Sequence, residues 1–264
     1  MPKVFFIGDI VGRPGRAIVN NKLPLFRSEH GVDLVVANGE NAAGGAGITA
    51  SIAGELKKSG IDGITLGDHV WDQRDWANEI DQVDWCCKPA NLPSRTPGRS
   101  FLILESESGF RLGVFTVLGR NFMKIDAAHP FETADRLLKQ LKETEAVDGV
   151  LVEIHAEATS EKVGLGWYLD GRASLVVGTH THIPTADTTV LPGGTAYLTD
   201  AGMTGPYASV LGRKTSDVLA RFQDGMPRRF PVAEKDVRLC GLLVEIDAAT
   251  GTSLSAERIE LKAD

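Results

Sequence analysis

The stretch Leu175-Val-Val-Gly-Thr-His-Thr-His182 joins a short aliphatic run to two histidines that stand two residues apart. Continuous apolar runs of this length are typical of strands buried on both faces of a sheet. Successive side chains of a strand point to opposite faces, so His180 and His182 share one face of an extended segment. We therefore predict a buried strand that ends in two imidazoles suited to a metal ion. The alternative is an exposed pair without a ligand.

Four other short apolar runs end in the same way, at glycine or at polar residues. Between some of them, residues 49–59 and 130–145 carry apolar side chains at helical spacing. Residues 14–30 also predict a helix, with a break or restart at Pro24. Alternation of strands and helices indicates an α/β protein with mostly parallel strands. The four runs are residues 4–7, 34–37, 61–66 and 150–152.

Two further segments are typical of β-hairpins. Residues 101–105 and 111–118 flank a turn at Gly109, and residues 239–246 and 253–261 flank a turn at 248–251. These hairpins predict a second sheet, packed on the first, with the helices outside. No internal repeat or linker-like stretch interrupts the sequence, so we predict that residues 1–264 form a single domain.

Composition and charge exclude several classes of protein. The chain has 264 residues, 42% of them hydrophobic, which argues against disorder, and no apolar run reaches the ~18 residues of a membrane span. It carries 28 Lys and Arg against 35 Asp and Glu, so no long nucleic acid is expected as a partner. Three cysteines are too few for a disulfide framework, and the N-terminal residues lack a secretory signal pattern. We expect a cytoplasmic protein.

Acidic, amide and imidazole side chains follow the five apolar runs. The carboxyl ends of parallel strands meet at one edge of a sheet, and ligands bind there. Taken singly, each residue has a simpler explanation as a helix cap, a solvated loop residue or a hydrogen-bonded core histidine. Their joint occurrence after five strands indicates a site. The residues are Asp9, Glu40, Asn41, Asp68, His69, His155, His180 and His182.

This donor set exceeds the four ligands of a tetrahedral zinc and fits two adjacent six-coordinate ions. Nitrogen and oxygen donors without thiolate favour Fe, Mn, Co or Zn. Three carboxylates packed together need compensating positive charge, and two divalent ions would leave a slight excess that suits an anionic substrate. Two metals roughly 3.5–4 Å apart promote in-line attack of a bridging hydroxide on phosphorus. We predict His69 as the acid that protonates the leaving oxygen.

The order of these motifs resembles the signature of the metallophosphoesterase (calcineurin-like) superfamily. Residues 155–162, 171–174 and 201–206 are similar to one subgroup, the YmdB-like bacterial 2',3'-cyclic-nucleotide 2'-phosphodiesterases. The likeness runs from residue 4 to about residue 260. The motifs that carry it are Gly8-Asp9, Gly39-Glu40-Asn41, Gly67-Asp68-His69, His155 and Gly178-Thr-His180-Thr-His182.

The resemblance implies a four-layer αββα sandwich with a di-iron or di-manganese site. Matching positions imply that one metal is held by Asp9, Glu40, Asn41 and His182. They imply that Glu40 bridges to a second metal, held also by Asp68, His155 and His180, and that His69 is the proton donor. The superfamily usually has Asn at the position of Asp68, and an extra carboxylate would bind its metal more tightly and lower the Lewis acidity of the site.

We therefore predict a metal-dependent phosphodiesterase that hydrolyses small phosphodiesters, with 2',3'-cyclic nucleotides as the substrate. One alternative is a broad-specificity phosphomonoesterase with the same metal core. Another is a metal-bound regulatory protein with weak activity. Asp68 supports this alternative, because its extra carboxylate would lower the Lewis acidity of the site. We expect no membrane partner, no nucleotide cofactor loop, and a homo-oligomer formed through an exposed hairpin edge.

Two further residues have open interpretations. Asp200 follows a short apolar segment and either orients a histidine of the site or caps a turn. Lys162 either contacts a substrate phosphate or is a surface charge, and we expect the surface charge, as we do for Arg13 and Arg172.

Overall fold

The computed structural model describes residues 1–263, and a seven-stranded sheet forms one half of it. Four of its strands run parallel in the order β1-β2-β3-β4, and β12 lies antiparallel beside β1. The strands β11 and β13 both pair with β12. The seven strands are β1 (Lys3–Ile7), β2 (Leu34–Asn38), β3 (Gly63–Thr65), β4 (Cys86–Cys87), β11 (Gly205–Pro206), β12 (Val237–Ile246) and β13 (Ser253–Lys262).

A six-stranded sheet forms the other half, in the order β5-β6-β7-β8-β10-β9. Its four central strands are parallel, and the two edge strands, β5 and β9, are antiparallel to their neighbours. The strands are β5 (Leu102–Glu105), β6 (Arg111–Leu118), β7 (Gly149–His155), β8 (Leu175–Thr179), β9 (Thr189–Val190) and β10 (Ala196–Leu198).

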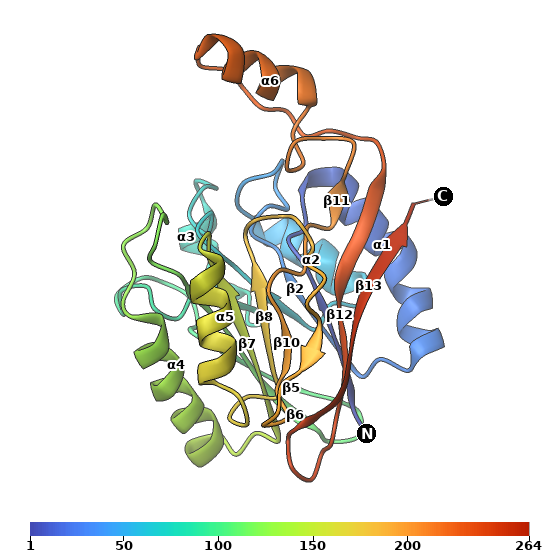
Figure 1. The fold of residues 1–264 in the computed structure, drawn as a ribbon, viewed down its shortest axis with the longest axis vertical. Coiled ribbons are helices and arrows are strands. Elements are labelled where there is room, and N and C mark those ends of the chain that lie inside the picture. Colours follow the sequence, from blue (N-terminus) through green and yellow to red (C-terminus); the bar gives the residue numbers. More distant parts are fainter. Residues whose placement is uncertain (264) are drawn as a thin grey trace.

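Helices cover the outer faces of the two sheets, with α4 and α5 on one side and α1 on the other (Figure 1). A further helix, α6, projects from the end of the layered body on a long excursion between β11 and β12 (Figure 1). The helices are α1 (Gly12–His30), α2 (Ala50–Lys58), α3 (Trp76–Glu79), η1 (Ile80–Gln82), α4 (Pro130–Lys139), the π-helix η2 (Gln140–Thr144), α5 (Thr159–Tyr168) and α6 (Thr215–Asp224). Within residues 1–263, no helix combines the length and the apolar character that a membrane crossing needs.

The alternation of side chains along β1 shows how the layers form. Phe5 and Ile7 pack into a buried cluster with residues of α1 and α2, such as Leu56. Val4 and Phe6 point the other way, into a cluster that both sheets share. A third cluster lies between the second sheet and α4 and α5. Three apolar layers between four layers of structure confirm the predicted αββα sandwich.

Both predicted hairpins are present, although they do not form a sheet of their own. β5 and β6 pair antiparallel and continue into the parallel strands β7 and β8, whereas β12 and β13 extend the first sheet beside β1. The five strands that lead into the predicted site are therefore divided between the two sheets. The sequence could not predict this division. A strand that is buried on both faces has the same aliphatic composition in either sheet.

The predicted break at Pro24 is wrong, because α1 continues through this residue to His30. Proline removes one backbone donor and crowds the preceding turn. Pro24 lies on the exposed side of α1, where water can reach the carbonyl that loses its partner, while Leu23 and Phe26 anchor the same turn in the core. Packing against the sheet thus outweighs the local penalty.

Candidate metal centre

Five strands end at one rim of the sandwich and deliver the predicted site residues there. Asp9 follows β1, Glu40 and Asn41 follow β2, and Asp68 and His69 follow β3 in the first sheet. In the second sheet, β7 ends at its residue 155, and β8 leads into the histidines at 180 and 182. The rim therefore combines the carboxyl ends of parallel strands from both sheets, rather than from one sheet.

Four of these residues form a tight cluster of metal-type ligands. One side-chain donor atom from each of Glu40, Asp68, His155 and His180 lies within 4.8 Å of all the others. Nε2 of His155 is 2.9 Å from Oδ1 of Asp68 and 3.1 Å from Oε1 of Glu40. Nδ1 of His180 is 3.2 Å from the same Asp68 oxygen. Carboxylate and imidazole donors at this spacing suit a divalent transition-metal ion.

Asp9, Asn41 and His182 continue the cluster on the other side of Glu40. Nδ2 of Asn41 is 3.1 Å from Oε1 of Glu40 and 3.3 Å from Nε2 of His182. Nε2 of His182 is in turn 3.9 Å from Oδ1 of Asp9. Glu40 thus stands between two groups of donors, as a residue shared by two ions would.

Asp9 shows most directly that the donor set fits a cation. Its side chain is fully buried, and its Oδ1 atom has no hydrogen-bond partner among the described residues. A buried carboxylate oxygen without a partner is costly, and a cation is the natural compensation. Burial, together with the nearby carboxylates of Glu40 and Asp200, raises the pKa of Asp9 above its usual value against the opposing effect of His182 and His155.

The charges of the cluster also shift the pKa of its other members. Burial alone lowers the pKa of His155, but the carboxylates of Glu40 and Asp68 outweigh it and raise that pKa well above its usual value. Burial raises the pKa of Glu40 and of Asp68, and the neighbouring imidazoles reverse this, so both pKa values fall. The ionised form of Glu40 and of Asp68 is therefore favoured, and it is the form that binds metal.

Glycine is required at position 67 because the backbone that follows β3 passes very close to the side chains of the cluster. A Cβ atom at this position would lie 2.2 Å from Oε2 of Glu40 and 2.4 Å from Nε2 of His155. Such distances are far inside van der Waals contact. The glycine before Asp68 therefore lets the chain pass directly against the ligand atoms, and a larger residue would displace them.

A buried hydrogen-bond network fixes the orientation of the His155 ring. Glu153 is fully buried, and its two oxygens accept hydrogen bonds from Asn38 (2.6 Å), Thr179 (2.6 Å) and Thr116 (2.8 Å). Because the Thr179 hydroxyl donates to Glu153, it must accept from Nδ1 of His155 at 2.9 Å. When the ring is neutral, its one proton therefore lies on Nδ1 and Nε2 is left to act as a ligand, whereas the surrounding carboxylates by themselves favour the protonated ring. The alternation of polar residues within β7 is the sequence signal that could have revealed Glu153.

The two histidines after β8 adopt a backbone conformation that is unfavourable for residues other than glycine. His180 has a φ of 92° and His182 a φ of 65°. Asp200 holds the residue between them, since its Oδ2 accepts from the backbone N (3.2 Å) and the hydroxyl (2.6 Å) of Thr181. Its Oδ1 also accepts from the backbone N of Gly202, two residues on, at 2.8 Å, so Asp200 forms a turn as well as holding the residue between the two histidines.

Lys162 is buried, so its predicted place on the surface is wrong. Its side chain is 1% exposed, and Nζ lies 2.7 Å from Oδ2 of Asp200. The lysine faces the sheet from α5 and neutralises the carboxylate that holds the histidine loop. Arg172 and Arg13 do lie at the surface, as expected, next to Asp135 and Glu234.

His69 lies at the open side of the cluster. Its ring Nδ1 is 2.7 Å from Oδ2 of Asp72, and its backbone N donates to Oε2 of Glu40 at 3.0 Å. Its side chain keeps 29% exposure and lines two adjoining cavities that also touch the cluster. Asp72 therefore occupies Nδ1 of a ring that borders both cavities.

Arg213 adds a positive charge that the sequence did not single out. It lines the same cavity as Glu40, Asn41 and His182, and its NH1 donates to the carbonyl oxygens of Gly44 (3.1 Å) and Phe230 (3.0 Å). Burial lowers its pKa from the usual value of a guanidinium. The residue joins the segment before α6 to the loop that follows the predicted ligands Glu40 and Asn41.

Comparison with known proteins agrees with this arrangement. A 2',3'-cyclic-nucleotide 2'-phosphodiesterase of Bacillus subtilis is 43% identical over 262 residues, covering 99% of this chain and 98% of the relative. The crystal structure of a hypothetical protein from Thermus thermophilus superimposes with a TM-score of 0.91 at 42% identity, over 99% of this chain and 100% of that one. That of a novel phosphatase from Mycoplasma pneumoniae gives 0.91 at 32% identity, over 99% and 93%. The model of the family described as YmdB-like protein matches residues 5–259, so the chain belongs to the YmdB-like family.

Proposed function

We propose that this protein is a metal-dependent phosphoric ester hydrolase whose substrate is a 2',3'-cyclic nucleotide. The observation that carries the proposal is the position of Glu40, which is buried, between two groups of carboxylate, amide and imidazole donors. The activity named for the Bacillus subtilis relative, which aligns over almost the whole of both chains, supports the choice of substrate.

We propose further that the site takes two ions. One would be held by Asp9, Glu40, Asn41 and His182, and the other by Glu40, Asp68, His155 and His180. When bound, the ions supply Lewis acidity and a nucleophile at neutral pH. Oxygen and nitrogen donors without thiolate suit iron or manganese, and the charge of the two ions exceeds that of the three carboxylates, which favours an anionic substrate.

His69 would supply the proton that the leaving oxygen needs. Water adds to phosphorus and loses one proton to the solvent, the bond between phosphorus and the 2' oxygen breaks, and that oxygen takes a proton from Nε2 of His69, which leaves a 3'-phosphomonoester. Asp72 accepts from Nδ1 at 2.7 Å and holds the ring in place for the transfer. The solvent-exposed edge of the ring lets it recover a proton after each turnover.

Replacing His69 with Ala should slow hydrolysis of 2',3'-cyclic AMP by roughly 10²-fold or more, since a positioned general acid contributes ~10²–10⁴-fold. The variant should keep its metal content, because the side chain is not among the proposed ligands. Bis(p-nitrophenyl) phosphate should be affected much less, since its leaving group is stable without a proton. Steady-state rates on both compounds, with metal analysis of each sample, check this.

His30→Ala, which removes an exposed imidazole at the end of α1, serves as the matched control and should behave as the wild type. Full activity of His69→Ala on the cyclic nucleotide would show that the proton comes from another group. An equal loss on both compounds would point to a damaged site instead of a lost acid.

A phosphomonoesterase activity is the second candidate, favoured by the phosphatase named in Mycoplasma pneumoniae. The proposed metal core would be the same for both reactions. Rates on 2',3'-cyclic AMP, bis(p-nitrophenyl) phosphate and p-nitrophenyl phosphate separate them. Faster hydrolysis of the monoester would overturn the proposed substrate class, and no turnover of any compound with iron or manganese loaded would favour a regulatory role.

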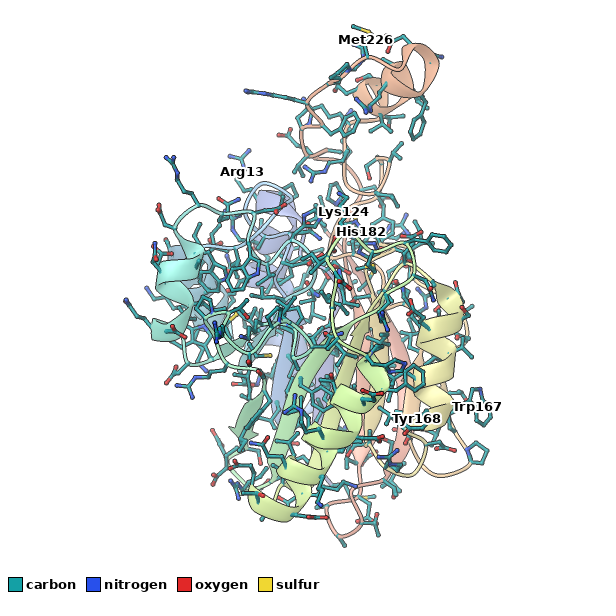
Figure 2. All side chains as sticks on the ribbon, turned by 90° about the vertical axis from the view of Figure 1, so that its left-hand side faces the viewer. Arg13, Lys124, Trp167, Tyr168, His182 and Met226 are labelled. Atoms are coloured by element: carbon teal, nitrogen blue, oxygen red, sulfur yellow. The ribbon has the colours of Figure 1, made fainter. Side chains whose placement is uncertain are left out.

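We also propose that the chain is a single domain that works as a homo-oligomer in the bacterial cytoplasm. Three free, buried cysteines suit a reducing compartment. The projecting segment around α6 exposes Leu219, Phe222 and Met226, which a second copy could cover (Figure 2 labels Met226 at its tip). Analytical ultracentrifugation of the purified protein tests the oligomeric state.

A further inference from the structure

A second cavity adjoins the cluster on the side of the loop that joins β6 to α4. It has a volume of about 440 Å³, within the ~300–1,000 Å³ of small-molecule sites. Phe122, Met123 and Lys124 of the loop line it, together with residues at the cluster, namely Asp68, His69, Glu157 and His180. Figure 2 shows Lys124 close to the end of the molecule that carries His182, and away from Trp167 and Tyr168.

Phe122 is unusual in both its exposure and its backbone. The residue is 87% exposed, and its φ is 64°, in the region that non-glycine residues seldom adopt. None of the ring-to-ring contacts found among residues 1–263 involves it. The fold therefore gains no burial from this phenyl ring and tolerates an unfavourable backbone to present it.

The loop that carries Phe122 is held firmly at both ends. At its start, the backbone N atoms of Arg120 and Asn121 donate to the two oxygens of Glu161, at 2.9 and 3.1 Å. At its end, Ala128 exchanges two 2.9 Å hydrogen bonds with Asn91. A fixed base with an exposed aromatic tip is a preorganised arrangement for binding a flat ligand.

We propose that Phe122 is the surface on which the nucleobase of the substrate stacks, with the ribose spanning the cavity to the metal centre. The inference rests on the proposed function and adds the place where the base of the proposed 2',3'-cyclic nucleotide binds. His69 lines this cavity as well as the adjoining one, so the proposed proton donor borders the space that the ribose would span. Lys124 and Glu157 place charges of opposite sign on the lining of this cavity.

Stacking also determines which bases are accepted. Every nucleobase offers a π-face, so an aromatic side chain that makes no contacts to the base edges discriminates weakly among the four bases. The side chains of the loop wall next to Phe122 are a thioether and an ammonium group, Met123 and Lys124. We expect all four 2',3'-cyclic nucleotides to be hydrolysed, with the larger purines favoured.

The test compares a nucleotide with a cyclic phosphate that lacks a base. Phe122→Ala should lower kcat/KM for 2',3'-cyclic AMP by about 10-fold or more, the scale of a lost base–aromatic stack. It should leave kcat/KM for glycerol 1,2-cyclic phosphate unchanged. Phe122→Trp should restore the nucleotide activity. Adenosine 3'-monophosphate should bind more weakly to Phe122→Ala by calorimetry, while inorganic phosphate binds as to the wild type.

Trp167→Ala, which removes another exposed aromatic ring from α5, is the matched control and should change none of these values. The melting temperature of Phe122→Ala should stay at the wild-type value, because the ring is not buried. Unchanged nucleotide kinetics, or an equal loss on both cyclic phosphates, would overturn the stacking proposal. Absence of turnover of either compound by the wild-type protein would instead overturn the proposed function.

Discussion

Replacing Glu40 with Gln should abolish detectable turnover and empty at least one of the two proposed metal positions. Glu40 is fully buried and touches both groups of donors, through His155 on one side and Asn41 on the other. The substitution keeps the size of the side chain but removes its charge and half of its ligand capacity. A metal site supplies several kcal/mol of transition-state stabilisation, so a loss on the order of 10³-fold or more is expected.

The measurement is kcat/KM for 2',3'-cyclic AMP, with the metal content of the same preparation by mass spectrometry. Glu29→Gln removes the same charge from the exposed end of α1 and serves as the control. Near-normal turnover by Glu40→Gln, with a full metal complement, would show that this carboxylate is not shared by the ions.

Replacing Lys162 with Met should lower the free energy of unfolding by about 3–5 kcal/mol, the cost of breaking a buried ion pair. The change leaves the Asp200 carboxylate buried without its cation, near the equally buried Asp9. For a chain of this size, each kcal/mol shifts Tm by ~2–4 °C, so a fall of roughly 10 °C is expected by calorimetry. Metal affinity should fall as well, because Asp200 also holds Thr181.

A double variant separates stability from positioning. Lys162→Met combined with Asp200→Leu removes both charges and should recover part of the lost stability, since an apolar pair can replace a buried ion pair. The hydrogen bonds from Thr181 to Asp200 are still absent in the double variant, so its metal affinity should remain low. Arg172→Met breaks the exposed pair with Asp135 and should cost no more than ~1 kcal/mol. A similar small cost for Lys162→Met would mean that the pair is not important for the fold.

The sequence was most informative where one physical signal points to one structure. Short aliphatic runs located the strands, and the helix of residues 49–59 begins with Thr49, whose hydroxyl accepts from the backbone N of Ile52. The residues after five strands lie at one rim because parallel strands align their carboxyl ends. Within each sheet their grouping follows from chain direction, whereas the packing of the two sheets brings the two sets together. Their individual roles remain proposals.

The sequence was less informative where the outcome depends on distant partners. Whether a strand such as β7 joins the first or the second sheet is decided by its neighbours, and aliphatic residues do not distinguish them. Lys162 was expected at the surface because only the approach of Asp200, 38 residues away, makes its burial favourable. Pro24 was expected to end a helix that tertiary packing holds intact.

Phe122 gives no signal in the sequence at all. From the sequence, a single phenylalanine in a polar loop would be expected to lie in the core. It is exposed because Glu161 and Asn91 hold the two ends of the loop, and the sequence does not show these contacts. The same applies to Arg213, whose place beside the cluster follows from the path of the segment before α6. Such residues can be identified only from a structure. Phenylalanine and arginine are common in any sequence, and the role of these two depends on where the fold places them.

Anomalous diffraction from crystals grown with manganese tests the metal centre most directly. Two peaks per chain are expected, one among Asp9, Asn41 and His182 and one among Asp68, His155 and His180, with the carboxylate at position 40 contacting both. A single peak, or manganese bound elsewhere while these side chains remain paired with one another, would contradict the account.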